Sequence, residues 1–141
     1  MQTQTLMAAL GYSGLLPFYV CAFAALFLWP GQHIAAQAFL VYATVILAFL
    51  GGTLWGYAVT QPLAEKHRRL VLSNLVALLA AGAALLGVTL VAVLLLALGQ
   101  ITLLLYERAQ GDPRGWYLSL RTKLTLGALP AHGLMVLHCL R

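Results

Sequence analysis

Five residues whose side chains could bind a polar ligand gather near the carboxyl-terminal third of the chain: Tyr106, Arg108, Trp116, Tyr117 and Arg121. Aromatic rings and cations favour the headgroup region of a bilayer, where an apolar body and a polar tip each find a suitable medium. Tyr117 and Arg121 are four residues apart, so they share one face of a helix. Two interpretations are open. The cluster anchors the chain at the interface, or it binds an anionic headgroup or the polar head of a quinone.

A second basic cluster consists of Lys66, Arg68 and Arg69, which follow directly on a long uncharged segment. Cations next to a membrane-spanning segment are attracted to anionic lipid headgroups. We therefore predict that these three residues contact anionic lipid.

Signatures of catalysis or metal binding are absent from the sequence. The three acidic residues are Glu65, Glu107 and Asp112, and the four histidines show no HExxH or other metal-ligand spacing. No pair of carboxylates inside an apolar segment suggests a proton relay. His132 does lie inside such a segment, where we expect a hydrogen bond between helices. We expect no enzyme activity, no metal and no cofactor.

The composition places the chain in a membrane. Of its 141 residues, 62% are hydrophobic and 8% are charged, whereas about a quarter of a soluble domain is charged. Residues 1–64 and 70–106 contain no Asp, Glu, Lys or Arg, and apolar stretches longer than about 18 residues indicate spanning helices. The net charge of +5 lies at the ends of these segments. It forms no basic stripe, so we expect no nucleic-acid partner.

The pattern predicts an all-α, single-domain bundle over residues 1–141 with five transmembrane helices. Their expected ranges are about 6–29, 34–60, 70–86, 89–106 and 118–140. Residues 70–106 as one helix would extend about 55 Å, against a hydrocarbon core of about 30 Å. The chain must therefore turn back within this segment, and residues 82–89 are the expected place.

The distribution of cations predicts the orientation. With five crossings, one side of the membrane holds Lys66, Arg68, Arg69, Arg108, Arg114, Arg121 and Lys123, and the other holds only Arg141. Because basic residues concentrate on the cytoplasmic side, we expect a cytoplasmic N-terminus and a C-terminus outside. Four crossings would place the two basic loops on opposite sides.

Small residues recur every fourth position in the second predicted helix: Thr44, Ala48, Gly52, Gly56 and Thr60, with Gly51 beside them. Small side chains let helices approach closely in lipid, where van der Waals contact drives association. Ala77 and Ala81 form a matching strip with Ser73 in the third helix. We predict that these two helices pack as an antiparallel pair, although the strip could equally serve another subunit. Glycine and alanine are also simply common in membrane helices.

Two predicted helices contain proline. Pro17 and Pro130 remove the backbone hydrogen bonds to the carbonyls of Ser13 and Leu126. We expect a kink at each position.

Three stretches together resemble a known family: "GLLPF" (14–18), "YATVILAFLGGTLWG" (42–56) and "YERAQGDPRGWYLSLRTKLT" (106–125). In order and spacing they are similar to domain-of-unknown-function family 3429, which includes transmembrane protein 69 of animals. The resemblance implies a small multi-pass protein of the bacterial inner membrane, or of the mitochondrial inner membrane in eukaryotes. The family pattern falls on Tyr42, Phe49, Gly51, Gly52, Trp55, Gly56, Tyr106, Arg108, Trp116, Tyr117 and Arg121. Ala48 and Leu54 stand where the family commonly has polar residues, which argues against polar chemistry in the second helix.

The leading hypothesis is a non-enzymatic accessory, scaffold or assembly subunit that packs through the small-residue strip. The alternative is a lipid- or quinone-binding protein, and a small-solute transporter comes third. The expected partners are membrane lipids and, in the first case, other membrane subunits or a second copy of the chain.

Overall fold

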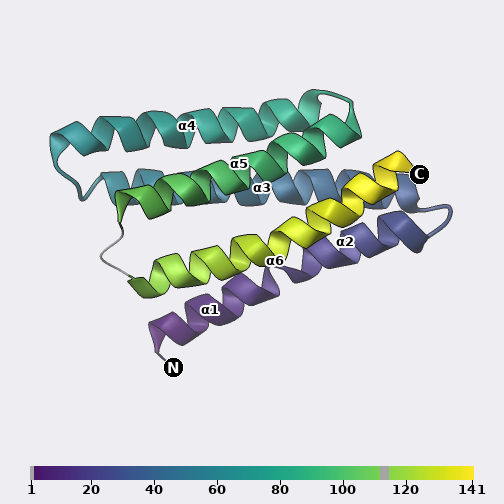
Figure 1. The fold of residues 1–141 in the computed structure, drawn as a ribbon, viewed down its shortest axis with the longest axis horizontal. Coiled ribbons are helices and arrows are strands. Elements are labelled where there is room, and N and C mark those ends of the chain that lie inside the picture. The colour runs from purple at the N-terminus through teal and green to yellow at the C-terminus, as the bar shows by residue number, and fades with distance from the viewer. Residues whose placement is uncertain (1, 112–114) are drawn as a thin grey trace.

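The computed structural model describes residues 2–111 and 115–141, without the side chains of residues 63 and 64. Every element within these ranges is an α-helix (Figure 1). The helices are α1 (Thr3–Ser13), α2 (Leu16–Phe27), α3 (Gln32–Ala58), α4 (Leu63–Leu85), α5 (Thr89–Gln110) and α6 (Gly115–Leu140).

The helices form five candidate membrane spans. Helices α1 and α2 lie end to end as one broken rod of 25 residues, and each of the other helices supplies one span of 21 to 27 residues. At 1.5 Å per residue, such lengths match a hydrocarbon core of about 30 Å. The chain is therefore a multi-pass membrane protein, and the predicted five-helix all-α class is confirmed. The two termini lie at opposite ends of the bundle (Figure 1), while the side that each one faces stays a prediction.

The uncharged turn in the middle of the chain lies where bilayer thickness requires it. Helix α4 ends at Leu85 and α5 begins at Thr89. Between them Gly87 has a φ of 71°, a left-handed conformation that costs glycine little because it has no Cβ. Gly82, the expected start of the turn, lies inside α4 instead.

Two predicted loops are shorter than expected. Helix α4 begins at Leu63, directly after Pro62, so Lys66, Arg68 and Arg69 lie in its first turns and not in a loop. Likewise α5 continues through Gln110. Charged residues mark the end of an apolar segment, but Glu, Lys and Arg are good helix formers. A helix therefore continues past the membrane boundary, and placing the helix ends at the charges was wrong.

The two prolines predicted to kink helices, Pro17 and Pro130, each lie three residues after a carbonyl that accepts a hydrogen bond from a tyrosine hydroxyl. Helix α1 ends at Ser13 and α2 begins at Leu16, and the hydroxyl of Tyr42 donates to the Gly14 carbonyl over 2.6 Å. Pro130 lies inside α6, and the hydroxyl of Tyr19 donates to the Gly127 carbonyl, also over 2.6 Å. In lipid, a polar backbone group needs a partner from the protein itself.

The two proline-containing spans lie against each other. A Cβ on Gly127 would lie 2.7 Å from Cδ1 of Leu15, and one on Gly11 would lie 2.7 Å from Cδ1 of Leu124. Glycine at these two positions therefore permits α1, α2 and α6 to approach closely. The sequence Gly-x-Leu-Pro occurs in both spans, at 14–17 and at 127–130.

Helices α3 and α4 are neighbours, but through a different face of α3 from the predicted one. Gly51 is buried, and a Cβ on it would lie 3.1 Å from the Ser73 carbonyl oxygen of α4. Gly52 and Gly56 are exposed, and a Cβ on either would have no atom of the described residues within 4 Å. Adjacent residues of a helix point about 100° apart, so Gly51 and Gly52 cannot both face α4.

Apart from Gly51 and Ser73, the residues of the two predicted strips are not buried. Ala81 is exposed, whereas Thr44, Ala48 and Ala77 are half-buried. The hydroxyl of Thr44 donates within its own helix, to the Leu40 carbonyl. The predicted packing role is therefore wrong for Gly52, Gly56 and Ala81 within a single chain.

An aromatic group lies in the core where α2, α3 and α6 meet. The rings of Phe18 and Phe39 pack edge to face with centroids 5.5 Å apart, and both lie against His132, at 5.3 and 5.0 Å. The expected interhelical hydrogen bond of His132 is wrong for Nδ1, because this atom lies 3.0 Å from the Ala128 carbonyl of its own helix.

Candidate functional site

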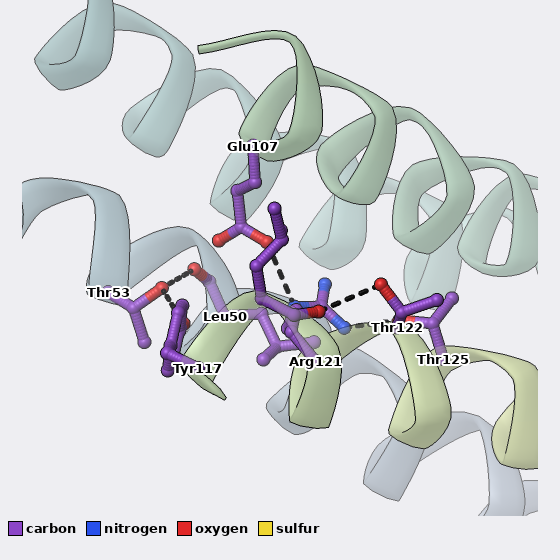
Figure 2. A network of polar contacts seen from close by, with 8 residues as sticks. Leu50, Thr53, Glu107, Tyr117, Arg121, Thr122 and Thr125 are labelled. Carbon is purple, nitrogen blue, oxygen red and sulfur yellow. Dashed lines mark hydrogen bonds and ion pairs between the residues drawn. The ribbon is translucent and has the colours of Figure 1, made fainter. Parts of the chain in front are cut away.

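A buried ion pair joins α5 to α6. Arg121 Nε lies 3.1 Å from Glu107 Oε2, and the two side chains are only 3% and 8% exposed. Figure 2 shows the Glu107 carboxylate extending from α5 toward the guanidinium on α6. Arg121 Nη1 also donates to the hydroxyl of Thr125, one turn further along α6. A charge buried this deeply requires an opposite charge and hydrogen bonds close to it.

A cavity of about 400 Å³ lies beside this ion pair. Its walls come from α1, α2, α3, α5 and α6, and most of its lining side chains are apolar. The lining residues are Met7, Leu10, Gly11, Gly14, Leu15, Phe18, Ile46, Phe49, Leu50, Thr53, Gln100, Tyr117, Leu120, Arg121, Leu124 and Ala128. We call this space the apolar cavity.

Two donors that line the apolar cavity have no hydrogen-bond partner within the described residues. They are Nε2 of Gln100 and Nη2 of Arg121. The two residues are only 1% and 3% exposed, and a buried polar group without a partner is costly. Both groups can donate to an acceptor oxygen on a molecule held in the cavity.

Tyr117 and Thr53 form the wall on the side of α3. The hydroxyl of Tyr117 donates to Thr53 Oγ1 over 3.4 Å, and Thr53 donates to the Leu50 carbonyl over 2.7 Å (Figure 2). These bonds link α6 to α3 and fix the position of the tyrosine ring at the edge of the cavity.

A second, more polar cavity of about 490 Å³ adjoins the first. The two cavities share Met7, Thr53 and Tyr117 in their walls, and Glu107 lines the second whereas Arg121 lines the first. The ion pair therefore stands between a polar and an apolar compartment. We call the second space the polar cavity.

A family model described as "Protein of unknown function (DUF3429)" matches residues 3–137. The chain belongs to this family. Neither the curated proteins nor the solved structures contain a match to it. The predicted family is confirmed, while the likeness to the animal protein stays a prediction.

In this DUF3429 protein, the five side chains predicted to form one headgroup site are divided among different surroundings. Tyr117 and Arg121 line the apolar cavity. Arg108 is exposed, and Trp116 is half-buried with its ring 6.2 Å from that of Tyr117. Tyr106 lines a separate small cavity of about 260 Å³. The prediction of a single site was therefore wrong for Arg108 and Tyr106, because helix α5 turns them away from Arg121.

The three predicted anionic-lipid contacts of the DUF3429 protein also differ from one another. Arg68 is exposed and Lys66 is half-buried, and their contact with anionic lipid stays a prediction. Arg69 is buried, with its guanidinium carbon 4.6 Å from the centre of the Tyr57 ring, and it lines the polar cavity. Arg69 thus faces the interior of the bundle. Of the charged residues named in the sequence analysis, Asp112 and Arg114 lie outside the described residues.

Sequence reasoning missed Glu107 and Gln100 as parts of the site. Glu107 was assigned no role in the site from the sequence. Its neighbour Arg108 is exposed while Glu107 is buried, because a helix points the two side chains in different directions. Gln100 is a polar residue inside the uncharged segment 70–106, and that was the available signal. Polar groups at membrane depth are costly unless they have a structural or functional role.

Proposed function

We propose that this protein binds a lipid-soluble molecule in the apolar cavity and holds acceptor oxygens of that molecule with Arg121 and Gln100. The observation that carries the proposal is the pair of buried, unpartnered donors in the wall of one cavity. A bound acceptor would satisfy both donors at once and would remove the cost of leaving them unpaired.

The size and lining of the cavity support this proposal. Small-molecule sites typically measure about 300–1,000 Å³, with mostly apolar walls and a few polar groups that fix orientation. The apolar cavity, at about 400 Å³, has this character. Leucine and phenylalanine side chains would contact an acyl chain or a ring, while the two donors would bind the polar end.

The proposed role is one of binding, without catalysis, in a bacterial inner membrane with the N-terminus in the cytoplasm. In this orientation the polar cavity, whose lining includes Gln110 at the end of α5, lies toward the cytoplasm. The ligand would be drawn from the membrane lipid itself.

Extraction of bound molecules tests the proposal. The wild-type protein is purified in a mild detergent, and its hydrophobic contents are identified and quantified by mass spectrometry. We expect one molecule per chain, and about tenfold less in Gln100→Leu and Arg121→Met, because one lost hydrogen bond of about 1.4 kcal/mol is tenfold in affinity. Arg108→Met removes an exposed cation nearby and should retain the ligand. Equal contents in all four proteins would refute the proposal.

A second candidate function is the assembly role, which the exposed backbone at Gly52 and Gly56 favours. No part of the described chain covers these glycines, and a helix of another subunit could approach closely there. Gly52→Leu should then reduce a complex seen on native gels of membranes extracted in mild detergent. Val45→Leu, at another exposed position of α3, is the matched control. A wild-type protein that migrates only as a monomer would exclude this function.

A further inference from the structure

The chemical class of the ligand follows from the charges around the apolar cavity, if the proposed function holds. The unpartnered atoms of the cavity, Arg121 Nη2 and Gln100 Nε2, are both donors. A guanidinium has no acceptor at all, and the free end of the glutamine amide is an NH₂ group. The part of the ligand that reaches these atoms must therefore be an acceptor oxygen.

The cavity offers this oxygen no net charge. Arg121 is the cation in the lining, and Glu107 already balances it at 3.1 Å. An anionic ligand would leave one uncompensated negative charge in a buried site of low dielectric, which is strongly unfavourable. A carbonyl oxygen accepts hydrogen bonds from the same two donors and adds no charge.

The remaining walls are suited to an uncharged body. Phe18, Phe49 and Leu124 are among the apolar side chains around the cavity, and aromatic and leucine side chains pack well against a flat ring or an alkyl chain. The polar groups of the lining are Arg121 and Gln100, together with the two hydroxyls of Thr53 and Tyr117, which bond to each other across α3 and α6.

We infer that the apolar cavity selects an uncharged, carbonyl-bearing hydrophobic molecule of the quinone class over a lipid with an anionic group. Arg121 and Gln100 donate to the carbonyl oxygen, and Glu107 sets the preference by neutralising Arg121. This inference rests on the proposed function and narrows it to one chemistry.

Direct competition tests the inference. The purified protein is mixed with a decyl-substituted benzoquinone and dodecanoate at equal concentration and pH 8, where dodecanoate is ionised. Native mass spectrometry then identifies each bound probe by its mass and measures the fraction of protein that carries it. We expect at least tenfold more quinone than dodecanoate on the wild type. Dioctanoylglycerol, an uncharged ester, is run in a parallel sample, and stronger binding of this ester than of the quinone would overturn the quinone assignment.

Two variants show whether the predicted groups cause the preference. Glu107→Gln leaves the Arg121 charge unbalanced and should raise bound dodecanoate about tenfold relative to quinone. Gln100→Leu leaves the ion pair intact and should lower bound quinone at least fivefold without changing dodecanoate, so the test survives if Glu107→Gln fails to fold. Leu105→Ala, at an exposed position of α5, should behave as the wild type.

The outcomes separate the inference from the function on which it rests. If the wild type binds dodecanoate as strongly as it binds the quinone, the inference is overturned and a lipid-binding function still stands. A quinone preference that is unchanged in both Glu107→Gln and Gln100→Leu also overturns it, because the probe then binds elsewhere. A folded wild type that binds none of the three probes contradicts both the inference and the proposed function.

Discussion

The hydroxyl of Tyr19 in α2 donates a hydrogen bond of 2.6 Å to the carbonyl of Gly127 in α6, three residues before Pro130. The same relationship occurs between Tyr42 and Gly14, three residues before Pro17. Each tyrosine belongs to a neighbouring helix, so each bond holds a proline-containing turn against the rest of the bundle. The acceptors lie one residue after Ser13 and Leu126, whose carbonyls lose their backbone partners to the two prolines, so the bonds tie the turn before each proline to a neighbouring helix.

Removal of either hydroxyl should weaken the bundle. We expect Tyr19→Phe and Tyr42→Phe each to lower the free energy of unfolding by about 1 kcal/mol, the usual size of a hydrogen bond between membrane helices. Unfolding by a rising fraction of denaturing detergent, followed by circular dichroism, measures the change. Tyr12→Phe, at an exposed tyrosine of α1, is the control, and an equal loss in all three variants would contradict the structural role.

The buried ion pair should show strong coupling between its members. Arg121→Met and Glu107→Leu should each lower the free energy of unfolding by about 3–5 kcal/mol, because each leaves an uncompensated buried charge. The double variant should lose less than the sum of the two by about 2 kcal/mol or more. The same detergent titration tests this. Additive losses would mean that the two groups do not interact in the membrane.

Adjacent glycines of α3 should respond differently to the same substitution. Gly51→Ala places a methyl group 3.1 Å from the Ser73 carbonyl oxygen, so α3 and α4 must shift apart. We expect a loss of about 1–2 kcal/mol, typical of overpacking. Gly52→Ala meets no atom of the described chain within 4 Å and should be neutral or slightly stabilising, because alanine is the better helix former. A larger loss at Gly52 than at Gly51 would contradict the described packing.

The ends of the chain should be reached from opposite sides of the membrane. In a background with Cys21→Ala and Cys139→Ala, single cysteines are introduced as Gln2→Cys and Arg141→Cys. A membrane-impermeant maleimide should label the second variant in intact spheroplasts and the first only after permeabilisation, as the positive-inside rule requires. Labelling of both ends from one side would disprove the five-crossing orientation.

The number of membrane spans could be predicted from the sequence, because it depends only on the length and apolarity of the segments. Residues 70–106 are too long for one crossing, and α4 and α5 indeed turn at Gly87. The packing of α3 against α4 was also predictable, since consecutive helices joined by a short loop pack together. The face that α3 presents to α4 was not. Small residues occupy both positions 51 and 52, and only the three-dimensional packing distinguishes them.

The candidate site was predictable only in part. Arg121 and Tyr117 were identified because they share a helical face, and both line the apolar cavity. Their partners were missed because Glu107 and Gln100 lie on another helix, and periodicity within one helix carries no information about the rotation of its neighbour. Charge that seems interfacial in the sequence can also turn inward, as Arg69 does over Tyr57.

The ion pair between Arg121 and Glu107 also bears on how the protein is made. Helix α6 is the least apolar of the five spans, and α5 is the most apolar. A newly synthesised α6 that entered lipid alone would carry the bare arginine charge toward the bilayer. Such a charge costs about 2.5–3.5 kcal/mol at the centre of a span and less near its end, where Arg121 lies. Helix α5 leaves the ribosome first with the carboxylate that neutralises this charge. We therefore expect the last two helices to enter the membrane together as a hairpin, with α5 as the insertion partner of α6.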